Sequence, residues 1–196
     1  MKSVLISIRP KWCELIASGK KTIEVRKSTP KLDTPFKCYI YCTNDYSNYR
    51  TRSHRNKFWV GEPLNNISKG RYLCNGKVIG EFVCDKVITV DCDSVAPFNP
   101  ETHDYIQDET CIDRSAFIHY TNFRKAFGWH ISDLKIYDKP KELHDFYRPC
   151  ERTKCENCSH LCIQNTPDSY ETWCDCDEKI PLTRPPQSWC YVEKLE

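Results

Sequence analysis

The sequence contains no long hydrophobic run and no strong excess of charge of either sign. None of its apolar stretches approaches the roughly 20 residues that a helix needs to span a membrane. The apolar stretch within residues 1–9 is too short for a signal peptide. We therefore expect a cytoplasmic protein with no membrane partner. The formal net charge is only +2, so any electrostatic attraction to nucleic acid must come from a local cluster of cations.

Internal repeats and low-complexity tracts are also absent. The chain has 196 residues, of which 39% are hydrophobic and 29% charged, a composition typical of one folded domain with a small appendage. Cysteine is the exception to this ordinary composition, with 14 residues spread unevenly. Seven lie within residues 1–149, mostly in apolar runs, where cysteine behaves as a small buried hydrophobe. The other seven lie in the last 47 residues, and this density suggests a metal site before it suggests disulfides.

Hydrophobic periodicity predicts an α+β fold built as a small mixed β-barrel with flanking helices. Pro10 suits the first position of a helix, and Gly19 suits the residue after its end. Gly80 suits a bulge or bend within a long strand. Strands are predicted at residues 3–8, 20–27, 36–42, 77–90, 131–137 and 188–193, with helices from Pro10 and at 115–127.

The segment Gly19-Lys20-Lys21-Thr22-Ile23-Glu24-Val25-Arg26 carries the clearest functional signal. Strand alternation places Thr22, Glu24 and Arg26 on one face, with Glu24 and Arg26 about 6–7 Å apart. Lys21 lies at the start of the strand and can turn toward the same place. Lysine and arginine bind phosphate, and glutamate accepts hydrogen bonds from base amines or acts as a general base. The alternative is a structural salt-bridge trio on the surface of the barrel.

A strand, a short helix and then Gly-x-Lys-x-x-Glu-x-Arg resemble the ASCH domain, a branch of the PUA-like barrels. Gly19, Lys21, Glu24 and Arg26 fit that pattern. Three flanking stretches also look like ASCH proteins of bacterial and prophage origin: residues 7–12, residues 129–134 and the closing residues 184–193. The resemblance covers residues 1–147 and 183–196 and leaves out a cysteine-rich insert at 148–182.

The resemblance implies a PUA-like barrel with a cleft that binds RNA or a modified nucleobase. Some small bacterial ASCH proteins are amidohydrolases that remove an acyl group from a modified cytidine, and others have been considered RNA-cleaving. The amidohydrolases use a lysine, a threonine three residues later and a distant glutamate. Lys21 matches the lysine, but Glu24 stands at the threonine position. Glu109, before the predicted helix, is a guess for the distant glutamate.

Candidate binding residues extend beyond the motif. Residues 46–59 mix cations with aromatic rings, a composition suited to single-stranded nucleic acid or to a loop that packs on the barrel. The predicted nucleotide-binding set is Lys21, Glu24, Arg26, Lys11, Arg52, Trp59 and His130. The predicted catalytic set is Lys21, Glu24 and Thr22, with the Thr22 hydroxyl as nucleophile and Glu24 as base.

The insert at 148–182 predicts a structural zinc site. Cys155 and Cys158 form a C-x-x-C pair, and Cys174 and Cys176 form a tighter pair after 15 intervening residues. Cys150 and Cys162 are alternative ligands. Disulfides and an iron–sulfur cluster remain alternatives. Four thiolates leave no open position on zinc, so a catalytic metal is not expected.

Three functions therefore stay open. The first is an RNA- or nucleobase-binding module. The second is a hydrolase acting on nucleoside amides or RNA phosphodiesters. The third is a phage-derived interaction module whose insert binds a protein partner.

Overall fold

The computed structural model describes residues 2–44, 57–61, 72–90, 107–149 and 180–193. Arg52 and the six cysteines of the insert lie outside the described residues, as does most of the cation- and aromatic-rich stretch before Trp59. The predicted zinc site and the division of the chain at residues 148–182 therefore stay predictions. None of the helices within the described residues is both long and apolar enough to cross a bilayer.

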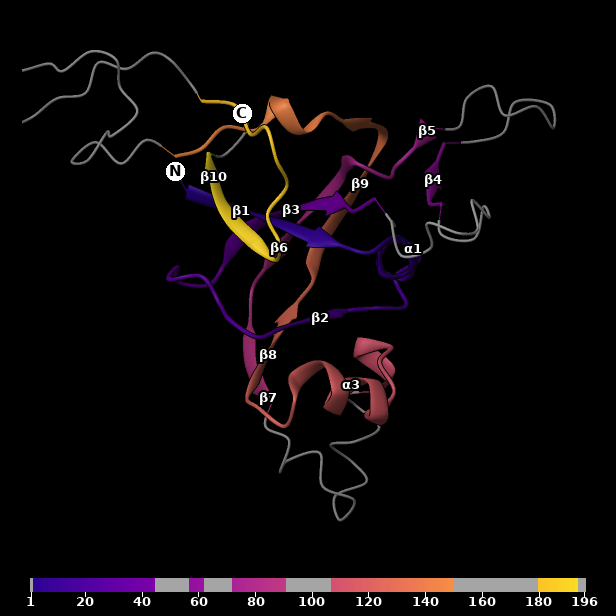
Figure 1. Cartoon of the computed structure of the whole chain (residues 1–196), viewed down its shortest axis with the longest axis vertical. Coiled ribbons are helices and arrows are strands. Elements are labelled where there is room, and N and C mark those ends of the chain that lie inside the picture. The colour runs from indigo at the N-terminus through magenta and orange to yellow at the C-terminus, as the bar shows by residue number, and fades with distance from the viewer. Residues whose placement is uncertain (1, 45–56, 62–71, 91–106, 150–179, 194–196) are drawn as a thin grey trace, which may run out of the picture.

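Most of the described strands form two sheets (Figure 1). The larger has five strands in the order β10-β1-β3-β6-β9, and the smaller has three in the order β2-β8-β7. A short hairpin of β4 and β5 stands apart. The large sheet contains β1 (Lys2–Ile8), β3 (Phe36–Cys42), β6 (Lys77–Cys84), β9 (Ser132–Lys141) and β10 (Trp189–Glu193). The others are β2 (Ile23–Arg26), β7 (Val87–Val90), β8 (Ala126–His130), β4 (Trp59–Val60) and β5 (Tyr72–Leu73).

The first helix follows the local signals closely. Helix α1 (Pro10–Ala17) begins with Pro10 at its first position, and Gly19 follows its end at φ +73°. Trp12 and Leu15 are partly exposed, while Cys13 and Ile16 are fully buried against the large sheet. The turn at Gly19 therefore delivers the chain directly into β2.

The predicted closed barrel is wrong for the described residues, because their strands form separate sheets with open edges. The predicted long strand at 77–90 divides at Asp85–Lys86, and its halves β6 and β7 belong to different sheets. A closed barrel needs one continuous ladder of hydrogen bonds, and this division interrupts it. Gly80 lies at a register shift between β6 and β9, as the sequence predicts, and an added Cβ there would be 2.4 Å from a backbone oxygen.

The helix predicted at 115–127 is shorter in the structure. Helix α3 (Arg114–Thr121) begins at Asp113, whose side chain accepts a hydrogen bond from the Ala116 N–H, and it ends at Asn122, which is left-handed at φ 52°. The following residues form β8, the central strand of the small sheet. A short 3-10 helix, η2 (Leu143–Asp145), follows β9.

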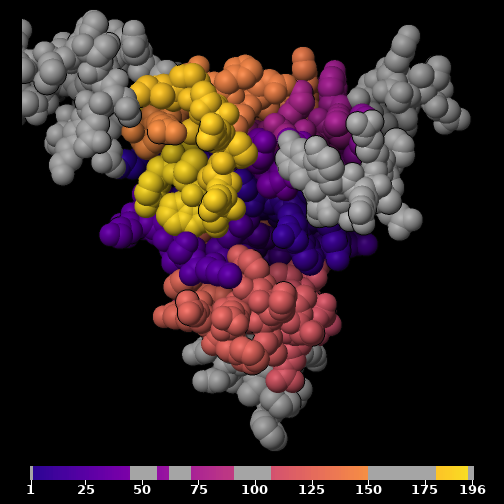
Figure 2. Space-filling view, in the orientation of Figure 1, coloured from indigo at the N-terminus to yellow at the C-terminus, as the bar shows by residue number. Residues whose placement is uncertain are grey.

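The large sheet carries a core on each face. Its main core contains Ile6, Ile40, Phe82 and Trp129. A second cluster contains Leu5, Tyr39, Phe146 and Val192. A third cluster, with Val25 and Phe117, joins the small sheet to α3. In Figure 2 the segment that contains α3 and β8 forms the lower lobe, beneath the N-terminal residues. Strand β2 runs along that junction (Figure 1).

Candidate functional site

Strand β2 is an edge strand of the small sheet. Backbone hydrogen bonds hold both the strand and the residue just before it. The strand pairs only with β8 among the described strands, with Glu24 opposite Trp129 and Arg26 opposite Phe127. Just before the strand, the Thr22 N–H donates to the Glu109 carbonyl at 2.9 Å. These bonds hold the motif at the junction between the two sheets.

Lys21, Glu24 and Arg26 form one buried ionic trio, as strand alternation predicts for Glu24 and Arg26. Glu24 Oε2 lies 3.3 Å from Lys21 Nζ, and Glu24 Oε1 lies 3.0 Å from Arg26 Nη2. The exposed fractions of the Lys21, Glu24 and Arg26 side chains are only 1%, 8% and 10%. Each of these buried charges needs its oppositely charged partner, because burying an unpaired charge costs much free energy.

The Lys21 ammonium has a complete set of partners. Its Nζ donates to the Ile23 carbonyl at 2.8 Å and to the Thr110 carbonyl at 2.6 Å. Glu24 is the third acceptor, and an ammonium has three protons to donate. The face of the Trp12 ring lies 5.2 Å from the same nitrogen. Lys21 therefore orients Glu24 and has no proton left for a ligand phosphate in this arrangement.

Arg26 is held firmly but keeps one donor without a partner. Its Nη2 donates to the Ser7 carbonyl at 2.6 Å as well as to Glu24. Its Nε is buried and has no hydrogen-bond partner among the described residues. A guanidinium presents its N–H donors in a fixed plane, so the two acceptors on Nη2 fix the orientation of the whole group.

Tyr120 of α3 lies against the Arg26 side chain and had no signal in the sequence. Burial raises the pKa of the Tyr120 phenol, and the charge of Glu24 adds to this effect, while Arg26 and Arg9 oppose it. The ring is still 37% exposed. Lys27 Nζ lies 5.0 Å from the ring centroid. We call Arg9, Arg26, Lys27 and Tyr120 the β2 site.

One comparison with known proteins finds a similarity in the part of the chain that contains this trio. Residues 6–90 match the family model of the ASCH domain. This part of the chain is similar to the ASCH domain. The match includes α1 and β2, and therefore Lys21, Glu24 and Arg26, and it ends before α3 and Tyr120. ASCH domains are associated with RNA binding and with hydrolase-like activity.

Two crystal structures similar to the chain are of ASCH from Zymomonas mobilis and of a tyrosine-to-phenylalanine mutant of that protein. The first is 18% identical with a TM-score of 0.48, and the match covers 98% of this chain and 88% of that one. The mutant is also 18% identical with a TM-score of 0.49, and the match covers 99% of this chain and 92% of that one. No curated protein matches the chain.

Three other predicted binding residues, His130, Lys11 and Trp59, lie at separate positions. His130 pairs with Ile23 across the ladder, so it lies on the opposite side of β2–β8 from Glu24, and its Nδ1 is 2.7 Å from Asp85 Oδ1. This bond is the largest cause of the lowered pKa of Asp85, and burial opposes it. Lys11 lies 4.8 Å from the Trp12 ring, close to the trio. Trp59 is 38% exposed in β4.

A backbone hydrogen bond joins Thr22, the predicted nucleophile, to Glu109, the guess for the distant glutamate. Thr22 Oγ1 and Glu109 Oε2 are both buried and without hydrogen-bond partners among the described residues. The Thr22 hydroxyl is therefore not bonded to Glu24, the base predicted for it. Buried polar atoms normally have partners, so these two orphaned oxygens are exceptions.

Proposed function

We propose that the chain binds single-stranded RNA, and that the β2 site is the place of contact. The observation that carries this proposal is the fixed guanidinium of Arg26, which lies beside the partly exposed aromatic ring of Tyr120. Glu24 and the Ser7 carbonyl hold the guanidinium in one orientation. A preorganised donor loses little conformational freedom on binding, so its interactions contribute more to affinity.

The charges of the site favour an anionic partner. Arg9 and Lys27 are exposed, and both lie close enough to Tyr120 to affect its pKa or contact its ring. The nearly neutral chain thus gathers cations at one edge of the small sheet. Local cations attract the phosphates of a nucleic acid even where the net charge does not.

The exposed ring of Tyr120 supplies the second element of single-strand recognition. Unpaired bases stack on aromatic rings, and one such contact contributes about 1–3 kcal/mol. Lys27 above the same ring places a cation next to the stacking surface. This combination suits an unpaired strand better than a duplex, whose bases are already stacked.

Titration of a fluorescently labelled single-stranded RNA, followed by anisotropy, tests the proposal. We expect Tyr120→Ala to weaken binding about 5- to 150-fold, the range that loss of one stacked base predicts. Phe123→Ala is the matched control, because Phe123 is 73% exposed next to the end of the same helix but lies outside the β2 site. Equal affinities for the wild type and the Tyr120 variant would rule out the proposed contact.

Arg9 and Lys27 need a separate variant, because their contribution is electrostatic. Arg9→Ala combined with Lys27→Ala should weaken RNA binding and reduce its salt dependence. Lys86→Ala is the control, since Lys86 is equally exposed but lies at the turn between β6 and β7. An unchanged salt dependence in the double variant would mean that the phosphates bind elsewhere.

A hydrolase is the second candidate function, and the orphaned oxygens of Thr22 and Glu109 favour it. Glu109 can act as a general base that takes a proton from water, and the water then attacks an amide carbonyl. The products are a carboxylic acid and an amine. Thr22, whose backbone N–H donates to the Glu109 carbonyl, carries the other orphaned oxygen. Glu24 keeps both of its oxygens in the ionic trio, so it is less suited than Glu109 to act as the base.

Incubation with a panel of N4-acylated cytidines, followed by chromatography of the released cytidine, tests the hydrolase. Turnover by the wild type that is lost in Glu109→Gln is the expected result. The substitution replaces the orphaned oxygen by an amide of similar shape, so a loss of rate reports on the base. No turnover across the panel would remove amide hydrolysis and leave the RNA-binding proposal unaffected.

A further inference from the structure

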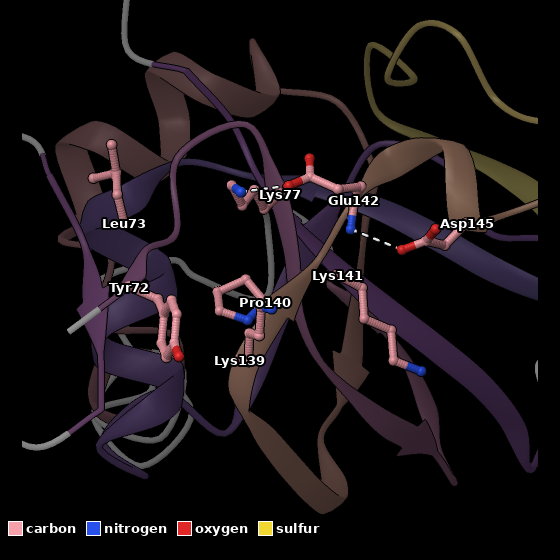
Figure 3. A pocket seen from close by; sticks show the side chains of 8 residues that line it. All are labelled: Tyr72, Leu73, Lys77, Lys139, Pro140, Lys141, Glu142 and Asp145. Atoms are coloured by element: carbon pink, nitrogen blue, oxygen red, sulfur yellow. Dashed lines mark hydrogen bonds and ion pairs between the residues drawn. The ribbon is translucent and has the colours of Figure 1, made fainter. Parts of the chain in front are cut away.

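A cavity of about 410 Å³ lies on the large sheet and shares no residue with the β2 site. It is formed where the β4–β5 hairpin, the start of β6 and the end of β9 meet (Figure 3). Its volume falls in the range of small-molecule sites, about 300–1,000 Å³. We call it the β9 pocket; its lining residues are Tyr72, Leu73, Lys77, Lys139, Pro140, Lys141, Glu142 and Asp145.

The two carboxylates of the pocket are already engaged. Glu142 Oε1 pairs with the Lys77 ammonium. Asp145 Oδ2 accepts a hydrogen bond from the Glu142 N–H at 3.0 Å, as part of a capping box around η2. Figure 3 shows both interactions on the same side of the cavity. These pairs fix the wall of the pocket and neutralise Lys77, leaving the other two lysines to set its charge.

Lys139 and Lys141 have no carboxylate within ion-pair distance among the described residues, and their contacts are with rings. Lys139 Nζ lies 6.0 Å from the centroid of Tyr72, and Lys141 Nζ lies 4.9 Å from that of Tyr137. Both lysines line the pocket, at the irregular end of β9 where the register with β6 shifts. Together they can neutralise one phosphate group.

The rest of the lining is apolar and includes a flat ring. Tyr72 is 42% exposed, a large fraction for an aromatic side chain in a strand. Figure 3 shows its ring beside Pro140 and Lys139, with Leu73 on the same strand. A ring next to a cation provides a stacking surface for a planar base and a charge for the phosphate attached to it.

From this arrangement we propose that the β9 pocket binds a nucleoside phosphate. The base stacks on Tyr72, and the phosphate lies between Lys139 and Lys141. The ligand is either a free mononucleotide or one nucleotide of an RNA strand, because both present the same chemistry. The pocket shares no side chain with the β2 site, so the proposal does not depend on RNA binding there.

Calorimetric titration of the full chain with AMP, CMP, GMP and UMP tests the proposal, with adenosine and inorganic phosphate as partial ligands. We expect at least one mononucleotide to bind, and both partial ligands to bind at least 10-fold more weakly. Lys139→Ala combined with Lys141→Ala should weaken mononucleotide binding at least 10-fold. Lys135→Ala is the matched control, because this exposed lysine lies on β9 but does not line the pocket.

Tyr72 gives a second, independent variant. Tyr72→Ala should weaken binding at least 5-fold, and Tyr72→Phe should restore it, because phenylalanine keeps the ring. The absence of binding by every mononucleotide would overturn the proposal, and so would unchanged affinity in either the double-lysine variant or Tyr72→Ala. Circular dichroism of each variant shows that it is folded.

Competition with a single-stranded RNA distinguishes the two sources of the ligand. Displacement of the bound mononucleotide by RNA in a β2-site variant supports a pocket that holds one nucleotide of a strand. Retention of the mononucleotide supports a pocket for the free ligand. Failure of RNA to bind at the β2 site leaves this result intact, because the titration reads the pocket directly.

Discussion

The sharpest test of the buried trio is Glu24→Gln. The substitution keeps the size and shape of the side chain and removes one negative charge. Lys21 and Arg26 would then remain buried without the carboxylate, which now lies 3.3 Å and 3.0 Å from their charged groups. Breaking a buried ion pair in this way costs about 3–5 kcal/mol, because a charge is left uncompensated away from water.

The structure places the expected loss at the lower end of that range. The Ile23 and Thr110 carbonyls still accept hydrogen bonds from Lys21 at 2.8 Å and 2.6 Å. The Ser7 carbonyl still accepts from Arg26 at 2.6 Å. We therefore expect unfolding free energy to fall by about 3 kcal/mol. For a chain of this size the melting temperature should fall by about 6–12 °C.

Urea denaturation followed by tryptophan fluorescence measures the change, and Glu81→Gln provides the control. Glu81 also pairs with a lysine, Lys37, at 2.8 Å, but the two side chains are 21% and 27% exposed. Burial raises the pKa of Glu81, and hydrogen bonds from Lys37 and Tyr137 outweigh it, so the pKa lies below its usual value. The control should lose only about 1 kcal/mol, since a partly solvated pair contributes little.

Equal, small losses in the two variants would refute this reasoning. A loss below about 1 kcal/mol for Glu24→Gln would mean that water reaches the trio and that Glu24 is not an indispensable counter-charge. The midpoint and the slope of the denaturation curve must be read together, because a changed slope signals a changed unfolded or native state.

Three further predictions concern the rest of the chain. Gly80→Ala should destabilise the protein by about 1–3 kcal/mol in the same denaturation assay, because its Cβ would be 2.4 Å from a backbone oxygen of β9; an unchanged midpoint would show that the strands can separate. Burial raises the pKa of Cys74 and Cys84 to about 12, so native protein at about pH 8 should hold both as unreactive thiols; peptide mapping after iodoacetamide treatment should find them modified only after denaturation, and equal labelling in both states would contradict their burial. Purified protein should contain about one zinc ion per chain by elemental analysis, and Cys155→Ser with Cys158→Ser should remove it; a metal-free wild type would favour disulfides or free thiols in the insert.

The parts of the fold that depend on local signals were predictable. Pro10 and Gly19 define the ends of α1 and its exit turn, since each has its effect through its own backbone. The strands at the two ends of the chain were also predicted, and they pair with each other in register, with Val4 opposite Tyr191. Backbone preference and alternation are enough to locate such elements.

The division into two sheets was not predictable, because it depends on distant contacts. In the sequence, alternation continues across Asp85. In the structure, the Lys86 carbonyl accepts a hydrogen bond from the His130 N–H, where the chain passes from one sheet to the other. The first two residues of β8, Ala126 and Phe127, were predicted as the end of a helix. Its Gly128 packs so closely that an added Cβ would be 2.8 Å from Ile23, a constraint that no local pattern reveals.

The candidate site shows the same limit. Alternation placed Glu24 and Arg26 on one face, and the structure confirms that they form an ion pair. One of the three acceptors around Lys21 is the carbonyl of Thr110, 89 residues away, so the saturation of the ammonium had no signal in the sequence. Tyr120 likewise reaches Arg26 only because α3 packs on the small sheet.

Ultraviolet crosslinking of a labelled single-stranded RNA to the full chain, with the attachment point mapped by mass spectrometry, tests the central claim most directly. Aromatic side chains that stack on bases are the expected points of attachment. The account predicts a crosslink in the peptide that contains Tyr120, which is lost in Tyr120→Ala and retained in Phe123→Ala. Crosslinks confined to other peptides, with none at Tyr120, would contradict an RNA contact at the β2 site.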